Sequence, residues 1–277
     1  MREITVAVVQ MHPQLGKVED NLGTMGKFID KICAEQNVDL IVFPELATTG
    51  YELGLRFTDV AERTTGHAVS FLAQHAADHS THILFGLVTK ERVESTLYNA
   101  AILIGPDGEM LGEYRKLHLP GEERLAFRPG YRLPVFETTF GQVGILLGWD
   151  LAFPEAARSL TLDGADLLCV CASWGHPPAQ ERLGAIEEWR TFVQARAAEN
   201  ALYIAASNRI GEEYSYHFFG DSMVVGPRAE VYASIDEEIE GYAVATIDLD
   251  AVRRTREEIQ LIQCRVPLAY RAIVRKY

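Results

Sequence analysis

The sequence is poor in cysteine and in long apolar segments. Among its 277 residues there are only four cysteines, Cys33, Cys169, Cys171 and Cys264, and none forms a CxxC pair. So few cysteines in a chain of this length fit a reducing cytoplasm, and a core of this size needs neither disulfides nor a structural metal. No apolar run approaches the roughly 18 residues of a membrane helix. The sequence therefore predicts a cytoplasmic protein without a membrane span.

Basic charge is also in short supply, with 26 Lys and Arg against 39 Asp and Glu and a formal net charge of -13. An acidic surface argues against nucleic acid or anionic membrane as partner and favours a small solute. The glycine spacing of a dinucleotide site and a phosphate loop are missing, so no cofactor is predicted. Cys169, Cys171 and His176 lack the spacing of zinc ligands, so no metal site is predicted either.

What is present is a regular succession of short apolar runs and longer helical patterns. There is no low-complexity stretch, linker or repeat, which predicts a single domain over residues 1–277. Strands are predicted at 4–10, 39–43, 82–88, 98–105, 142–148, 166–173, 201–207, 221–226 and 242–249. Helices are predicted at 20–36, 67–79, 154–164, 182–199 and 250–258. Turn residues at 105–109 and 226–230 predict hairpins, so crossovers and hairpins together indicate an α/β fold with mixed sheets.

Glu45 follows a fully apolar strand and stands directly behind a proline, in VFPEL at 42–46. Desolvation at such a position raises the pKa of a carboxyl group, which suits a general base. A glutamate at a strand end is also an ordinary ion-pair partner or helix cap. The local sequence alone leaves both interpretations open.

Lys116 lies in EYRKLHLP at 113–120, and Glu122 and Glu123 follow it in a loop. A lysine after a strand can hold an oxyanion or keep a neighbouring carboxylate ionised. Taken singly, however, a lysine or a pair of loop glutamates usually faces solvent. These residues gain a role only from their combination with others.

A strand-to-helix elbow is predicted where the apolar run at 142–148 meets the helix at 154–164. Such elbows commonly carry the nucleophile of α/β enzymes. Here the elbow reads Gly148, Trp149, Asp150, which offers no nucleophilic side chain. Asp150 is interpreted as a cap or a structural acid, and Gly148 taken by itself is a turn glycine.

Together these segments resemble the nitrilase, or carbon–nitrogen hydrolase, superfamily over nearly the whole chain and in the family's order. VFPELATTGY (42–51) looks like the segment with the catalytic glutamate, YRKLHL (114–119) like that with the catalytic lysine, and EERLAFRPG (122–130) like the loop with a supporting glutamate. Further matching patterns are GADLLCVCASW (164–174), RAAENALYIAASNRIG (196–211) and FGDSMVVGPRAEV (219–231). Each motif is weak alone, but their order and spacing make chance agreement very improbable.

The resemblance implies a four-layer α-β-β-α sandwich with two mixed β-sheets, commonly paired into dimers or larger homo-oligomers. It also implies hydrolysis of a non-peptide C–N bond through attack by a cysteine thiolate. By the motif matches, Glu45 is the general base, Lys116 the oxyanion donor and Glu123 the supporting acid. Base, nucleophile and donor must converge on one carbon atom, which is the physical requirement of this chemistry.

The chain departs from the family pattern at the nucleophile. In GILLGWDLAFPE (144–155), Trp149, Asp150 and the stretch 153–155 align, and Gly148 stands at the cysteine position. Loss of a covalent nucleophile costs on the order of 10⁶ in kcat in a comparable hydrolase. This chain is therefore predicted to be nearly inactive in the usual mechanism.

Gly148 leaves two explanations open: an amidase inactivated by engineering, or a natural pseudoenzyme that binds a ligand or a partner. Rescue by Cys169 or Cys171 is disfavoured, because both are expected to be buried structural cysteines. A water molecule activated by Glu45 is expected to react slowly.

The preferred substrate is a small amide or an N-carbamoyl compound, with a nitrile as the alternative. Chain length favours the compact amidase and carbamoylase branches, whereas Trp149 and Asp150 share one residue each with the nitrilase and amidase patterns. Tyr51, Trp149 and Trp174 are the candidate pocket walls, since aromatic walls with few polar groups suit small organic ligands. The C-terminal stretch 262–277 is apolar enough to pack on a second subunit or to close its own.

Overall fold

The computed structural model describes residues 2–177 and 182–275, which form two six-stranded sheets packed face to face. Strand order in the first sheet is β15 (Gly241–Asp248), β1 (Glu3–Gln10), β2 (Leu40–Val42), β3 (His82–Lys90), β4 (Leu97–Ile104), β5 (Met110–Arg115). The second runs β14 (Val231–Ser234), β13 (Met223–Val225), β10 (Tyr203–Asn208), β8 (Leu167–Ala172), β7 (Gln142–Leu147), β6 (Val135–Glu137). Both sheets have parallel centres and antiparallel edges.

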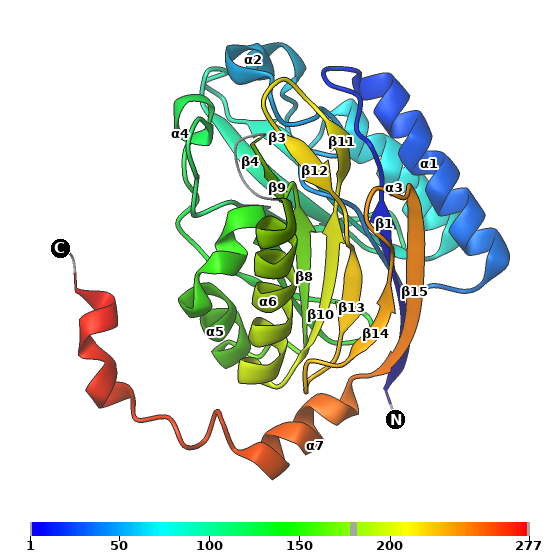
Figure 1. Ribbon diagram of the computed structural model, residues 1–277. Helices are drawn as coiled ribbons and strands as arrows, with labels where there is room; N and C mark the ends of the chain where they lie inside the picture. The colour runs from blue at the N-terminus through cyan, green and yellow to red at the C-terminus, as the bar shows by residue number, and fades with distance from the viewer. Residues whose placement is uncertain (1, 178–181, 276–277) are drawn as a thin grey trace.

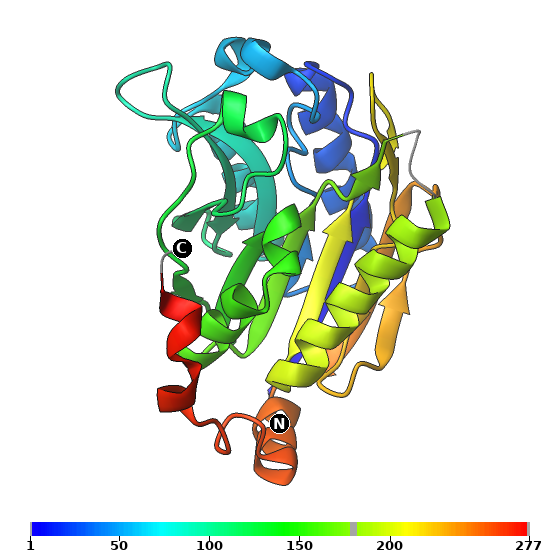
Figure 2. The ribbon, with the colours of Figure 1, turned by 60° about the vertical axis from the view of Figure 1, so that its left-hand side comes forward.

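Helices cover the outer face of each sheet, which gives the predicted four layers (Figure 1). α1 (Val18–Glu35) and α3 (His67–His79) lie on the first sheet. α5 (Pro154–Leu162) and α6 (Arg182–Asn200) lie on the second, as Figure 2 also shows. The predicted α-β-β-α sandwich with two mixed sheets is thus confirmed.

Strand β1 shows why the sheets are buried on both sides. Its side chains alternate, so that Val6 and Val8 enter the core between the sheets while Ala7 and Val9 contact the α1 and α3 layer. A strand used on both faces must be apolar throughout, which is the pattern that the sequence displays.

The predicted elements agree with the structure to within about two residues at each end. The run at 201–207 begins as a strand only at Tyr203, because Ala201 has a φ of 47° in the turn after α6. The run at 221–226 begins at Met223, because Asp221 has a φ of 61°. Left-handed backbone ends a strand, and propensity at single positions does not predict it.

Several short elements were not predicted, because segments this short show no periodicity. They include a third sheet of β11 (Ile210–Glu212), β12 (His217–Phe219) and β9 (Gly175–His176). The short helices are α2 (Phe57–Val60), α4 (Glu123–Ala126) and the 3₁₀ turns η1 (Gly54–Arg56), η2 (Gly148–Ala152) and η3 (Pro267–Val274).

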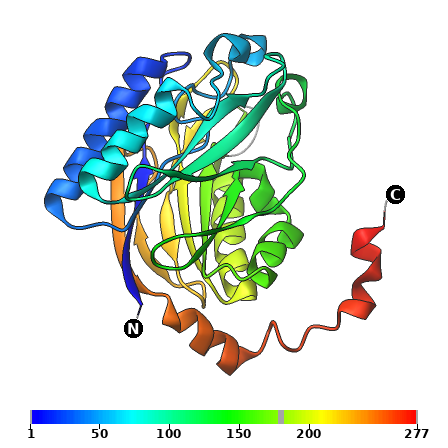
Figure 3. The same ribbon diagram turned by 180° about the vertical axis from the view of Figure 1, so that it is seen from behind.

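The C-terminal segment after α7 (Asp250–Ile259) lies away from the sandwich along one side of it (Figure 3). Its apolar side chains Leu268, Ile273 and Val274 are exposed. Among the described residues, no helix has the length and hydrophobicity needed to cross a bilayer.

Candidate active site

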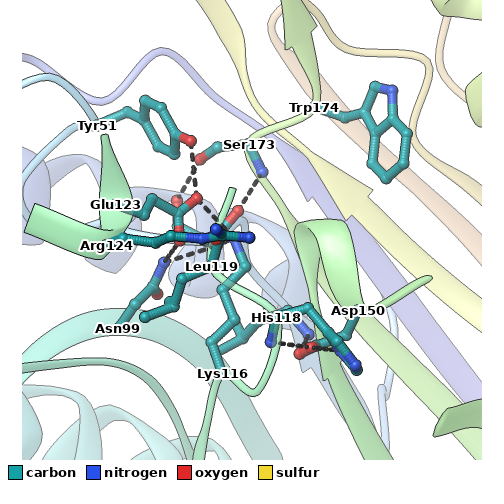
Figure 4. A network of polar contacts seen from close by, with 12 residues as sticks. Tyr51, Asn99, Lys116, His118, Leu119, Glu123, Arg124, Asp150, Ser173 and Trp174 are labelled. Atoms are coloured by element: carbon teal, nitrogen blue, oxygen red, sulfur yellow. Dashed lines mark hydrogen bonds and ion pairs between the residues drawn. The ribbon is translucent and has the colours of Figure 1, made fainter. Parts of the chain in front are cut away.

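Glu45 follows β2 and is buried where the two sheets meet. The close approach depends on Gly86 of β3, since a Cβ there would lie 2.6 Å from the Glu45 Cα. Three donors hold the carboxylate. Lys116 Nζ and Asn99 Nδ2 each donate to Oε1 at 2.7 Å, and the Ser173 N–H donates to Oε2 at 2.9 Å (Figure 4).

Lys116 comes directly after β5, is fully buried, and joins Glu45 to Glu123, with its Nζ 2.7 Å from an oxygen of each. Burial lowers the pKa of the ammonium, but the charges of Glu123 and Glu45 outweigh burial and raise it above its usual range. Lys116 therefore remains a cation at neutral pH.

Glu123 opens α4 and is buried beside the same ammonium. Tyr51 Oη donates to its Oε1 at 2.7 Å, and Asn99 Nδ2 lies 3.4 Å from its Oε2. Burial raises the pKa of Glu123 to about 7, in spite of the opposing effect of Lys116. The set Glu45, Asn99, Lys116 and Glu123, called here the Lys116 cluster, thus has two carboxyl groups for one cation.

Gly148 occupies the elbow between β7 and η2 with a φ of 40°, in the left-handed region. A Cβ added there would lie 2.5 Å from Glu45 Oε2. The Glu45 carboxylate therefore fills the space that a side chain at 148 would use. Gly148 is next to the Lys116 cluster, but it is not among the residues that line the adjoining pocket.

Asp150 fixes the elbow from below through a second buried set, Tyr114, His118, Leu147 and Asp150, called here the Asp150 cluster. Its Oδ2 accepts from Tyr114 Oη at 2.6 Å and from the Leu147 N–H at 3.2 Å. Its Oδ1 accepts from the His118 N–H at 2.9 Å and lies 2.7 Å from His118 Nδ1. With two partners on each oxygen, Asp150 is a structural acid.

A pocket of about 360 Å³ opens beside the Lys116 cluster. The three predicted wall residues, Tyr51, Trp149 and Trp174, all line it together with Glu45, Lys116 and Glu123. It shares lining residues with a neighbouring cavity of about 540 Å³, which Glu52 and Glu122 also line. The arrangement combines a base, a cation and aromatic walls around a space for a small molecule.

Comparison with known proteins assigns the family. The model of the carbon–nitrogen hydrolase family matches residues 5–257. The chain belongs to the carbon–nitrogen hydrolase family. It is 38% identical to a probable nitrilase of Schizosaccharomyces pombe, over 97% of this chain and 98% of that one. It is 34% identical to the N-carbamoylputrescine amidase of Arabidopsis thaliana, over 66% of each.

A solved relative shows the chemistry of the family. The amidase of Nesterenkonia sp. AN1 superposes on this hydrolase with a TM-score of 0.78, at 27% identity, covering 93% of this chain and 95% of that one. In that crystal structure the acetamide moiety of fluoroacetamide is added covalently at the active-site cysteine.

The sequence interpretation of this hydrolase missed two residues that hold Glu45. Asn99, in the apolar strand β4, donates to Glu45, and its own Oδ1 has no hydrogen-bond partner. Ser173, after β8, donates its N–H to Glu45. A lone Asn within an apolar strand was a usable signal for the first, whereas a backbone donor such as Ser173 leaves no trace in side-chain identity.

Cys169 and Cys171 are buried in β8, and neither lines the pocket. Burial raises the pKa of both thiols, Cys171 well above its usual range. A thiol held in its neutral form is a poor nucleophile. Neither cysteine is positioned to replace a residue at 148.

Proposed function

We propose that this hydrolase has the scaffold of an amidase for a small amide or N-carbamoyl compound, and that Gly148 leaves the chain able to bind but not to turn over its substrate. The convergence of Glu45, Lys116 and Glu123 beside the elbow, at the wall of an aromatic pocket, supports this proposal. A nitrile is the alternative substrate, and the name of the fission yeast relative favours keeping it in the tests.

The proposed chemistry needs a thiol at position 148. Glu45, whose carboxylate adjoins this position, would take the thiol proton and pass it to the leaving ammonia. Lys116 and the backbone N–H of Trp149 would stabilise the tetrahedral oxyanion. Glu123 would hold Lys116 in place, and water would then hydrolyse the thioester with Glu45 as base.

One observation favours a second candidate function, that of a natural pseudoenzyme. The Glu45 carboxylate fills the space at Gly148 and is held there by Ser173 as well as by Lys116. A side chain at 148 would displace the carboxylate and take up a left-handed conformation, at a cost of about 1–3 kcal/mol. A binding protein would have no need to reverse this arrangement.

The deciding experiment measures ammonia release from small amides, N-carbamoyl compounds and nitriles by this chain and by Gly148→Cys. Gly148→Ala is the matched control, because it adds the same Cβ at the same backbone angle without a thiol. Turnover by the cysteine variant alone supports the amidase, with the substrate class given by the panel. No turnover by any folded variant sinks the amidase proposal for these substrates and favours the pseudoenzyme. Turnover by the glycine chain itself contradicts the assignment of position 148.

The neighbouring cavity favours a substrate with a cationic tail. Glu52, Glu122 and Glu188 line the two connected cavities, and aromatic faces stand beside them, including Tyr214 and Tyr216. Among the described lining residues Lys116 is the one basic side chain, and its charge is already matched by acids. Carboxylates and aromatic faces together attract ammonium groups.

The inactive chain makes this preference measurable at equilibrium. Calorimetry should show tighter binding of an N-carbamoyl compound with an aminoalkyl tail than of one with a carboxyalkyl tail of equal length. Glu122→Gln should reduce the difference, whereas Glu155→Gln, an exposed acid outside both cavities, should not. Equal affinity for both tails contradicts the cationic preference alone.

Homo-oligomerisation and a cytoplasmic location complete the proposal. The exposed apolar side chains Leu268, Ile273 and Val274 support packing of the C-terminal segment on a second copy. The unpaired state of all four cysteines supports a reducing compartment. Light scattering on the full chain and on a chain ending at residue 260 tests the first point, and the proposal expects a smaller assembly from the shorter chain.

A further inference from the structure

Two helices far from the candidate active site bring together two imidazoles and a carboxylate. α1 and α3 lie side by side on the outer face of the first sheet, where Figure 3 shows them in blue and cyan. Asp30 projects from α1, while His75 and His79 are one helical turn apart on α3. Each of the three offers one ligand atom, and these atoms all lie within 4.8 Å of one another.

The distances suit a small divalent transition-metal ion. His75 Nδ1 lies 3.3 Å and His79 Nε2 lies 2.9 Å from the same oxygen, Oδ1 of Asp30. Donors in a tetrahedral zinc site are roughly 3.3 Å apart, given Zn–N and Zn–O bonds of about 2.0–2.2 Å. The exposed Asp30 side chain is free to adjust to a cation placed between the three donors.

Packing fixes which imidazole nitrogens face the carboxylate. The opposite nitrogen of His75, Nε2, is held against α1, since a Cβ on Gly26 would lie 3.0 Å from it. The His75 and His79 rings are stacked with an interplanar angle of 13°, so both present an edge to Asp30. His79 is also the last residue of α3, where the negative end of the helix dipole favours a cation.

We propose that Asp30, His75 and His79 form a binding site for Zn²⁺ or a similar borderline-soft divalent ion, with water completing the coordination. Two imidazoles and one carboxylate are a donor set for Zn²⁺, Ni²⁺ or Cu²⁺ rather than for Mg²⁺. The bound ion joins α1 to α3 across the outer helical layer. The site is independent of the proposed amidase chemistry, which lies at the opposite face of the sheet.

Calorimetric titration of Zn²⁺ into the full chain, purified without a histidine tag, tests the proposal. We expect one Zn²⁺ per chain, and at least about tenfold weaker binding in His79→Gln and Asp30→Asn. The matched control is His67→Gln, which removes a histidine of the same helix that contacts a single acid, Glu19, at 3.3 Å. This control should bind Zn²⁺ like the unaltered chain.

Thermal unfolding gives a second measurement that does not depend on activity. Zn²⁺ should raise the unfolding midpoint of the unaltered chain and of His67→Gln, because it binds the folded state. It should leave His79→Gln unchanged, and Mg²⁺ should shift none of them. Because His79 is at the helix end, its replacement spares the packing of His75 on Gly26. Absence of Zn²⁺ binding, or equal binding by His79→Gln and the unaltered chain, overturns the proposal.

Discussion

The Lys116 cluster and the Asp150 cluster are both buried sets of polar groups at the same elbow, yet they differ in how fully they are satisfied. Asp150 has two partners on each carboxylate oxygen and no contact with the pocket. In the Lys116 cluster two carboxyl groups share one ammonium, and the Asn99 Oδ1 has no partner. Full satisfaction is typical of a structural role, whereas excess charge at a pocket wall indicates a place prepared for a ligand.

The largest expected effect concerns Glu45, and it is measured in the Gly148→Cys background. Adding Glu45→Gln keeps the shape of the side chain but removes the base, so kcat should fall by about 10²–10⁴. Glu155→Gln, which replaces an exposed acid, should leave kcat unchanged. If Glu45→Gln retains full turnover, the Lys116 cluster contains no catalytic base and the contrast between the clusters loses its functional meaning.

Replacement of Lys116 should give the largest loss of stability. Lys116→Met leaves Glu45 and Glu123 buried without a cation, and breaking a buried pair in this way costs about 3–5 kcal/mol of unfolding free energy. Urea denaturation measures the loss, and Lys27→Met on the exposed face of α1 is the control. A loss below about 1 kcal/mol would show that water or a proton compensates the two acids.

The sequence predicted the sandwich because its strands are apolar on both faces, as the alternation of β1 around Val6 and Ala7 shows. It placed Glu45, Lys116 and Glu123 at the ends of elements, and the structure brings these three side chains into direct contact. That contact supports the assigned roles, which themselves remain predictions.

What the sequence could not predict depends on three-dimensional packing. The support of Glu45 by the Ser173 N–H involves a backbone group, and all non-proline residues carry one. The occupation of the space at Gly148 by the Glu45 carboxylate depends on side-chain positions across two sheets. A motif shows that a cysteine is missing, but only coordinates show what has taken its place.

The pH dependence of stability distinguishes the excess acid from the saturated one. The folded-state pKa of Glu123 is raised from 4.5 to about 7, so between these values the folded chain holds a proton that the unfolded chain releases. Stability should therefore fall as pH rises from about 4.5 to 7, by an amount on the order of 3 kcal/mol. Glu123→Gln should match the unaltered chain below pH 4.5 and be more stable above pH 7, as measured by urea denaturation across this range. Equal pH profiles for the two proteins would contradict the raised pKa.

Asp150→Asn is the counterpart of Glu123→Gln and should have the opposite sign. The amide group would place a donor where the Leu147 N–H and Tyr114 Oη, or the His118 N–H and Nδ1, already donate to the acid. The loss of charge-assisted hydrogen bonds should cost about 1.5–3 kcal/mol at pH 8. The two substitutions make the same chemical change, a carboxylate to an amide, at one elbow. If both destabilise the protein equally at pH 8, saturation is not what separates the clusters, and the excess charge beside Lys116 loses its value as a sign of function.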